Sequence, residues 1–301
     1  MSHVSTLPSL AALALAFALS AAAGAQTPHP SFAVTVSGHG PAIVLIPGLL
    51  STGEVWDTTV ERYKDRHTLH VRTLAGFGGP APVGAPFLPR VREELIGYLR
   101  GVRSERGDKP ILVGHSLGGF LALWVAATAP ELVAGVVAVD GVPFLPALAN
   151  PAATADGAKA QGDMIRTMYA GFTTDQLVDQ SRLALTTMIT APADVERALE
   201  WVRRSDPATA GNAVAELMST DLRPLLAALS APTLLIGASG AAPEGMQPAF
   251  EKAYELQVAA APRARVIMAT KARHFIMLDD PAFLFAALDE FLDARGAGQG
   301  H

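Results

Sequence analysis

The sequence predicts an α/β protein with a mostly parallel central sheet and helices on both of its faces. Short, continuous apolar runs such as Ala42-Ile43-Val44-Leu45-Ile46 are typical of strands that are buried on both faces. Segments with apolar residues at helical spacing separate these runs. Turn-forming residues follow them, as at Pro47-Gly48. Because strands that alternate with helices are joined by right-handed crossovers, we expect most of the sheet to be parallel.

The first half of the chain contains most of the expected strands. The segment 32–37 alternates in polarity, and the later runs are β-branched and apolar. We expect strands at 32–37, 42–46, 68–74, 111–114 and 135–140. Helices are expected at 54–66, at 89–103, and from Ser116 to near Pro130, because apolar residues recur there at helical spacing.

The composition changes after Gly141. Between 143 and 229 there is no strong strand run, and amphipathic helical stretches occur at 157–170, 174–189, 192–204 and 207–218. The alternating pattern then resumes, with strands at 232–237 and 265–269 and helices at 247–260 and 281–295. We therefore expect a helical cap inserted after the strand that ends at Asp140. The expected domains are a core in two parts, 26–142 and 230–295, a cap, 143–229, and a loose tail, 296–301.

Composition limits the classes of partner. The chain has 301 residues and a formal net charge of −5, which gives no electrostatic reason to expect a nucleic-acid partner. It contains no Cys, which excludes disulfide bonds and thiolate chemistry. No metal-ligand cluster, phosphate-binding loop or dinucleotide fingerprint stands out, so we expect neither a metal nor a cofactor. The expected partner is a small-molecule substrate, and the oligomeric state is left open.

The first residues resemble a secretory signal. Residues 10–23 are almost entirely Ala, Leu and Phe, and Ala23-Gly24-Ala25 matches a small-x-small cleavage site. This apolar run is too short to span a membrane readily, and no later stretch has the pattern of a transmembrane segment. We expect cleavage after Ala25, a mature chain beginning at Gln26, and a periplasmic or secreted protein. Because residues 1–9 contain no Lys or Arg, an uncleaved anchor or an apolar tail is the alternative.

A G-x-S-x-G motif organises the chain, with an apolar run before it and an Ala/Leu-rich run after it. A strand that turns into a helix within four residues bends sharply. Gly114 and Gly118 leave room for that bend, because a Cβ at either position would strike the neighbouring strand or helix. Ser116 then stands at the tip, and the N–H of Leu117 points into the same space from the first helical turn. This arrangement suits a nucleophile whose attack creates an oxyanion; the alternative is a tight turn with an idle Ser.

A nucleophilic Ser requires a neighbouring base, and His274 is the best candidate. It lies just beyond the last expected strand and before the last expected helix, from where a base can reach a nucleophile on a central strand. The alternative is a surface His in a loop. His115 is next to Ser116, but we expect it to point away from Ser116 and to pack or hydrogen-bond beneath the turn.

From about 32 to 292, apart from the helical insert, the chain resembles α/β-hydrolases of the capped, esterase-like kind. The residues that carry the resemblance are Pro47-Gly48-Leu49, Gly114-His115-Ser116-Leu117-Gly118-Gly119 and Arg273-His274-Phe275. The resemblance implies a triad in the order Ser, acid, His. It also implies an oxyanion hole, which we assign to the N–H groups of Leu49 and Leu117. Several members carry His-Gly where this chain has Pro-Gly, but a backbone N–H serves equally well there.

The acid departs from the usual pattern of that family. The loop after the next-to-last strand contains no Asp, and Glu244 comes several residues too late. A subset of the family takes its acid from the end of the preceding strand, where Asp140 stands. We therefore predict that Asp140 holds His274 through Nδ1–H. Glu244 and a cap residue such as Asp206 or Asp221 are the alternatives, and Asp140 could instead bind backbone N–H groups of its loop.

Several large apolar side chains of the expected cap are candidates to line an adaptable pocket. Packing inside the cap is the better explanation for most of them. They are Met164, Met168, Met188, Met218, Phe144, Phe172 and Trp201.

These features predict a secreted or periplasmic serine hydrolase that cleaves an ester or lactone of a small to medium, fairly apolar compound through an acyl-enzyme on Ser116. The same Ser and His would also serve C–C bond or amide hydrolysis, or perhydrolysis without a cofactor. A Ser nucleophile argues against the dehalogenase branch, which uses Asp. A binding protein that keeps the fold without catalysis is supported by the missing loop Asp and opposed by the intact Ser116 and His274. The fold alone does not decide among these functions.

Overall fold

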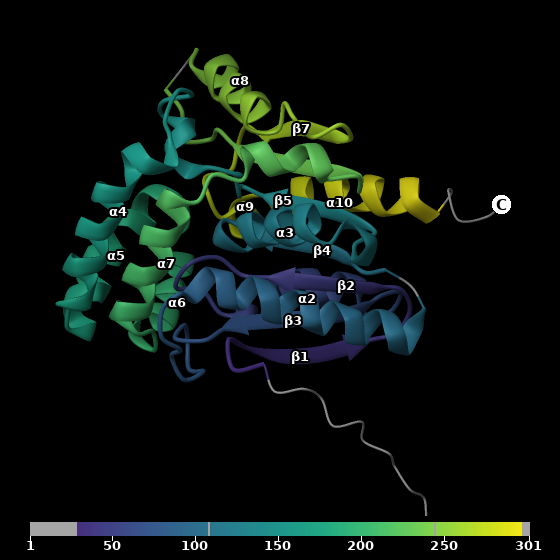
Figure 1. Ribbon diagram of the computed structural model, residues 1–301, viewed down its shortest axis with the longest axis horizontal. Helices are drawn as coiled ribbons and strands as arrows, with labels where there is room; N and C mark the ends of the chain where they lie inside the picture. Colours follow the sequence, from purple (N-terminus) through teal and green to yellow (C-terminus); the bar gives the residue numbers. More distant parts are fainter. Residues whose placement is uncertain (1–28, 108, 244, 297–301) are drawn as a thin grey trace, which may run out of the picture.

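Figure 1 shows the computed structural model, which describes residues 29–107, 109–243 and 245–296. Within these ranges seven strands form one sheet in the order β1-β3-β2-β4-β5-β6-β7. β1 is antiparallel to β3, and every other neighbouring pair is parallel. The strands are β1 (Phe32–Gly38), β2 (Ala42–Ile46), β3 (Thr68–Leu74), β4 (Ile111–His115), β5 (Gly135–Val139), β6 (Thr233–Ala238) and β7 (Ala264–Ala269). The predicted strands are therefore confirmed, with ends that agree to about one residue.

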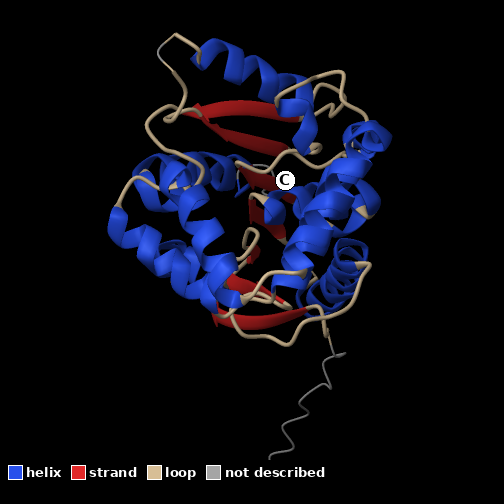
Figure 2. Cartoon of the chain, turned by 90° about the vertical axis from the view of Figure 1, so that its left-hand side faces the viewer, coloured by secondary structure: helices blue, strands red, loops and turns tan. Residues whose placement is uncertain are grey.

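Helices cover both faces of the sheet, as predicted, and Figure 2 shows them (blue) on either side of the strands (red). One apolar cluster joins the sheet to α2, α3 and α8, and a second joins the opposite face to α1 and α10. Their bounds are α1 (Asp57–Tyr63), α2 (Phe87–Arg106), α3 (Leu117–Thr128), α8 (Gln247–Gln257) and α10 (Pro281–Gly296), with a short α9 (Ile276–Asp279) before the last. The helix predicted over 54–66 is in fact a 3₁₀ turn (Gly53–Trp56) followed by α1, and it ends earlier than expected.

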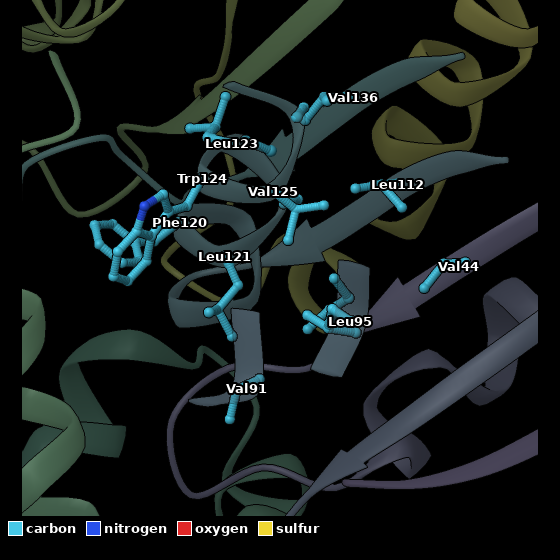
Figure 3. Close-up of a cluster of buried hydrophobic side chains, with 14 of the residues drawn as sticks. Val44, Val91, Leu95, Leu112, Phe120, Leu121, Leu123, Trp124, Val125 and Val136 are labelled. Carbon is cyan, nitrogen blue, oxygen red and sulfur yellow. The ribbon is translucent and has the colours of Figure 1, made fainter. Parts of the chain in front are cut away.

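The helix that follows Ser116 is enclosed by the core. Every residue of α3 from Leu117 to Ala127 is buried, as expected for a helix that is apolar on all sides. In Figure 3 the side chains of Val44, Leu112 and Val136, from β2, β4 and β5, lie in the same cluster as the α3 side chains. Because α3 begins directly after Ser116, this packing fixes the position of the turn as well.

The turn between β4 and α3 brings backbone against backbone. A Cβ at Gly114 would lie 2.1 Å from the carbonyl oxygen of Gly118, within the turn itself. A Cβ at Gly118 would lie 2.2 Å from the carbonyl oxygen of Ile46 on β2. Side chains at either position would therefore push the helix away from the strands, which is the role predicted for these two glycines.

Residues 143–229, all of them described, contain four α-helices and no strand. These are α4 (Ala155–Ala170), α5 (Thr174–Met188), α6 (Pro192–Arg203) and α7 (Pro207–Ser219). α4 packs against α7, and α5 packs against α6. In Figure 1 the four helices stand together at the left, beyond the carboxyl ends of β2 and β3. The helices match the predicted ones closely, and the division of the chain into core and cap domains stays a prediction.

Some predictions fall on residues whose structure is not described. The predicted signal sequence, 1–25, and residues 297–301 lie outside the described ranges. Gly296, the predicted first residue of the tail, is instead the last residue of α10. In the part of the chain that is described, no helix has the length and the apolar character that a membrane span requires.

We expect Gly118→Ala to lower the free energy of unfolding by about 3 kcal/mol or more, because its Cβ meets a strand carbonyl that has no room to move. The matched control is Gly97→Ala, on the exposed side of α2, where a Cβ meets nothing within 4 Å. That variant should gain about 0.5–1 kcal/mol from the better helix propensity of Ala. Urea unfolding followed by circular dichroism measures both, and equal stability of the two variants would contradict the packing argument.

Candidate active site

Ser116 occupies the tip of the turn in a strained backbone conformation. Its φ is 52° and its ψ is −118°. Among the described non-glycine residues, only Leu50, Ser116 and Asp140 have positive φ, and all three line one cavity. Each such conformation costs on the order of 1–3 kcal/mol, and such strain clusters at functional sites. The strain therefore marks the cavity as the candidate active site.

The cavity has a volume of about 380 Å³. This lies in the range of about 300–1,000 Å³ that small-molecule sites occupy. The loops at the carboxyl ends of β2, β4, β5 and β7 form its floor, and helices α4 to α7 contribute further walls. The structure brings all five predicted site residues to its lining: Leu49, Ser116, Leu117, Asp140 and His274.

His274 and Asp140 are in direct contact. His274 Nδ1 lies 2.5 Å from Asp140 Oδ2, so Nδ1–H donates to the carboxylate. The other oxygen, Asp140 Oδ1, accepts from the backbone N–H of Ala238 at 2.9 Å and from the hydroxyl of Tyr254 at 2.5 Å. Only 8% of the Asp140 side chain is exposed. The carboxylate is thus nearly enclosed, and its two oxygens accept three hydrogen bonds.

Neighbouring segments hold the His274 loop in place. The backbone N–H of Arg273 donates to Asp279 Oδ2 at 2.8 Å, and the N–H of Phe275 donates to the carbonyl of Met188 at 3.2 Å. Met188 ends α5, so the loop is bound both to α9 and to the helical segment that follows β5. The imidazole is therefore carried by a loop that is fastened on both sides.

His115 is buried beneath the turn, as the sequence indicated. Its Nε2–H donates to the carbonyl of His274 at 3.1 Å, and the two ring centroids lie 4.7 Å apart. Burial, together with the nearby His274, holds the pKa of His115 well below its usual value. His115 is therefore neutral, and it supports His274 through a hydrogen bond without adding a charge beside it.

The alternative acids are bound elsewhere or lie outside the described residues. Asp206 caps α7 and accepts from the backbone N–H of Thr209 at 2.7 Å. Asp221 forms an ion pair with Arg223 at 2.6 Å. Glu244 is not among the described residues. Of these candidates, Asp140 is the carboxylate in contact with His274.

The two predicted oxyanion donors belong to segments that adjoin Ser116. Leu117 is the first residue of α3, where a helix has no internal acceptor for its N–H groups. Leu49 follows Gly48, at which a Cβ would lie 3.1 Å from Ser116 Cβ. The loop after β2 thus lies directly against the Ser116 side chain.

The apolar wall of the cavity is only partly the one considered from sequence. Met188 and Trp201 line the cavity. Met164 and Met168 do not line it, and these two residues are 66% and 46% exposed. Phe144 is fully buried in a separate small cluster, against which Met218 packs. Phe172 is partly buried and packs against the cluster that joins the sheet to α1 and α10. Helical spacing alone did not distinguish the exposed face of α4 from its buried face.

Tyr254 is the site residue that sequence reasoning missed. It lies on α8, between β6 and β7, and its hydroxyl reaches Asp140 across a sequence separation of 114 residues. No motif surrounds it. The only available signal was its place in the expected helix after 237, which packs beside the carboxyl end of β6.

The comparisons with known proteins show the family of this chain. The profile described as the alpha/beta hydrolase family matches residues 43–287, which is most of the chain. The chain belongs to this family. This confirms the predicted resemblance and the predicted fold.

This α/β-hydrolase is also similar to named enzymes. The pimeloyl-[acyl-carrier protein] methyl ester esterase of Nitrosomonas europaea is 29% identical over 213 residues, which cover 68% of this chain and 79% of the relative. The protein of the same name from Edwardsiella ictaluri is 28% identical over 264 residues, covering 84% of this chain and 93% of the relative.

Solved structures share the fold of this α/β-hydrolase. A hydrolase from Pseudomonas aeruginosa aligns with a TM-score of 0.71 at 20% identity, covering 87% of this chain and 94% of that chain. The enol-lactonase from Burkholderia xenovorans aligns with a TM-score of 0.67 at 16% identity, covering 87% of this chain and 96% of that chain. At these identities the likeness establishes the common fold only.

We expect Asp140→Asn to lower kcat by about four powers of ten, the loss that the same change causes in a serine protease triad. Asn keeps an oxygen for Ala238 N–H and Tyr254 but turns an NH₂ group towards His274, which forces the wrong imidazole tautomer. The melting temperature should change little. Steady-state kinetics and thermal unfolding test this, with Asp206→Asn as the control that keeps its kcat; wild-type turnover by Asp140→Asn would refute the role of Asp140.

Proposed function

We propose that this α/β-hydrolase cleaves carboxylic esters, lactones included, through an acyl-enzyme on Ser116, with His274 as the base and Asp140 as the acid of the triad. The observation that carries the proposal is the 2.5 Å contact between His274 Nδ1 and Asp140 Oδ2 in the cavity that Ser116 also lines. The ester chemistry is supported by the similarity to two methyl ester esterases. Both relatives are ester hydrolases by name, and the family's fold hosts many chemistries.

The proposed reaction proceeds in two balanced steps. Ser116 Oγ attacks the carbonyl carbon while His274 Nε2 takes its proton, and the N–H groups of Leu49 and Leu117 bind the oxyanion. The intermediate collapses, the C–O bond breaks, and the alcohol leaves with the proton from His274. A water molecule then gives a proton to His274 and attacks the acyl carbon. The bond between the acyl carbon and Ser116 Oγ breaks, Oγ takes the proton back from His274, and the acid leaves. Asp140 stays ionised throughout and stabilises the imidazolium.

The lining of the cavity favours an uncharged, fairly apolar acyl group. Among the described residues that line it, none is Lys or Arg, and Asp140 is the single carboxylate. A substrate carboxylate inside the cavity would therefore have no cation to pair with and would lie near a fixed negative charge. Moving an unpaired charge out of water costs several kcal/mol. The substrate class that fits is a small to medium neutral ester.

The alternative function, a binding protein that keeps the fold without catalysis, loses its main argument. It was supported by the missing Asp in the loop after β6, and Asp140 supplies a carboxylate to His274 from the end of β5 instead.

We also propose that the mature protein is secreted or periplasmic, on the strength of residues 10–25. N-terminal sequencing of the exported protein should then begin at Gln26.

We expect a fluorophosphonate probe to attach to Ser116 in the native protein, because the probe mimics an ester at an activated Ser. Peptide mass spectrometry should place the added mass on the peptide that contains Ser116, and Ser116→Ala should be neither labelled nor active. The matched control is Ser181→Ala, which removes another hydroxyl from the cavity lining, on α5, and should leave labelling intact. Undiminished labelling of Ser116→Ala would refute the assignment.

We expect a strong preference for neutral acyl chains over acidic ones of the same length. The matched pair is methyl hexanoate and monomethyl adipate, which differ by a terminal carboxylate. The value of kcat/KM should be at least about 100-fold higher for methyl hexanoate, because the cavity lining offers the carboxylate no cation. Proton release measured in a pH-stat compares the two directly, and equal values would contradict the argument from the lining.

A further inference from the structure

We propose that Tyr254 is a positioning residue that orients the Asp140 carboxylate towards His274, an inference that rests on the proposed Ser116–His274–Asp140 triad. Tyr254 is a helix residue outside every motif of the chain, and it is 5% exposed. Its hydroxyl donates to Asp140 Oδ1 at 2.5 Å, while Asp140 Oδ2 accepts from His274 at 2.5 Å. The two carboxylate oxygens thus have separate tasks, one for support and one for the imidazole.

The support is needed because a single hydrogen bond does not fix the plane of a carboxylate. Asp140 is the first residue beyond β5, and its backbone has left the strand conformation, with φ at 49°. The N–H of Ala238 reaches Oδ1 from β6, at the neighbouring strand end. With that bond as the only support of Oδ1, the carboxylate could still turn about its Cβ–Cγ bond and carry Oδ2 away from His274. The Tyr254 hydroxyl approaches Oδ1 from α8 and restricts that rotation.

Helix α8 is itself tied to the segment that begins at Asp140. Gln257, one turn after Tyr254, accepts from the backbone N–H of Phe144 at 3.1 Å and donates to the carbonyl of Phe144 at 2.9 Å. Residues three apart lie on the same helix face. One face of α8 therefore binds both Asp140 and the chain four residues beyond it. These contacts hold the Tyr254 hydroxyl in a fixed position relative to Asp140.

The chemistry of the Tyr254 hydroxyl suits a permanent donor. Burial, together with the charge of Asp140, raises the pKa of Tyr254 well above its usual value. The phenol therefore remains protonated wherever the imidazole can act as a base. Gly237 also allows this approach, because a Cβ there would lie 2.9 Å from Cδ1 of the Tyr254 ring.

Tyr254→Phe removes the hydroxyl and keeps the buried ring. We expect kcat of ester hydrolysis to fall by about 10- to 100-fold, the range for a lost hydrogen bond to a charged group, while KM stays within about twofold. The matched control is Tyr63→Phe. Tyr63 is also buried and donates to a carboxylate, Asp289 Oδ1, at 2.9 Å, but it lies on α1, outside the cavity lining. Tyr63→Phe should keep the wild-type kcat.

A double-mutant cycle with Asp140→Asn separates positioning from other roles. If Tyr254 acts through Asp140, Tyr254→Phe should change kcat by less than about threefold once the carboxylate is gone. An equal loss of kcat in both backgrounds would overturn the proposal, because Tyr254 would then act independently of Asp140. A raised KM with unchanged kcat would also overturn it, since Tyr254 would then only contact the substrate.

A measurement on the resting protein, without substrate turnover, tests the role of Tyr254 independently of the proposed function. The proton NMR resonance of His274 Nδ1–H reports its bond to Asp140 in the resting protein. We expect Tyr254→Phe to shift or broaden that resonance and Tyr63→Phe to leave it unchanged. If the wild-type protein hydrolyses no ester, the proposed function fails, and the resonance still decides on Tyr254. An unchanged resonance in folded Tyr254→Phe would overturn the positioning role.

Discussion

Contact between backbone segments at the Ser116 turn is the constraint on which the rest of the site depends. The helix that follows Ser116 packs so closely on β2 that Gly118 has no space for a Cβ, which would lie 2.2 Å from the Ile46 carbonyl oxygen. On the other side, a Cβ at Gly141 would lie 2.4 Å from the carbonyl oxygen of Ser116 itself. The loop after β2, the turn after β4 and the loop after β5 are therefore locked together by atoms that have no rotameric freedom. The candidate nucleophile, one candidate oxyanion donor and the candidate acid lie on these three segments.

The same close packing creates the electrostatic character of the site. Asp140 is nearly enclosed, and its charge is balanced by donors that are themselves held by secondary structure. His115 lies beneath the Ser116 turn as a neutral ring, because burial disfavours its protonated form. A charged His115 would oppose the imidazolium that forms on His274 during the proposed reaction. In a water-poor site such differences have large effects, since the electrostatic interactions are weakly screened.

Local strain is the cost of this arrangement, and the surrounding core supports it. Leu50, Ser116 and Asp140 adopt positive φ values, which are uncommon for residues other than glycine. Each of the three is followed or preceded by elements that are deeply buried, above all the fully enclosed first turns of α3. The core therefore stabilises a geometry at the carboxyl ends of the strands that short peptides of the same sequence would not adopt.

Much of this protein was determined by its sequence alone. The strands, the helices and the turn at Ser116 follow from short-range patterns: apolar runs, helical spacing and the two glycines around the Ser. Because the Ser116 turn and the His274 loop both follow expected strands of a mostly parallel sheet, they were also expected at the same edge of the sheet. Asp140 was the predicted acid among several candidates. These features are local or depend on chain order, so the sequence encodes them directly.

The tertiary structure decided what local pattern does not encode. The contact between Asp140 and His274 joins residues that are 134 positions apart, and the contact with Tyr254 spans 114 positions. The exposure of Met164 and the burial of Phe144 likewise depend on how the helices after β5 pack on one another and on α8. Such contacts are set by the crossing of whole elements, and a hydrogen bond depends on distances of a few tenths of an ångström. Only the folded chain brings the groups to those distances.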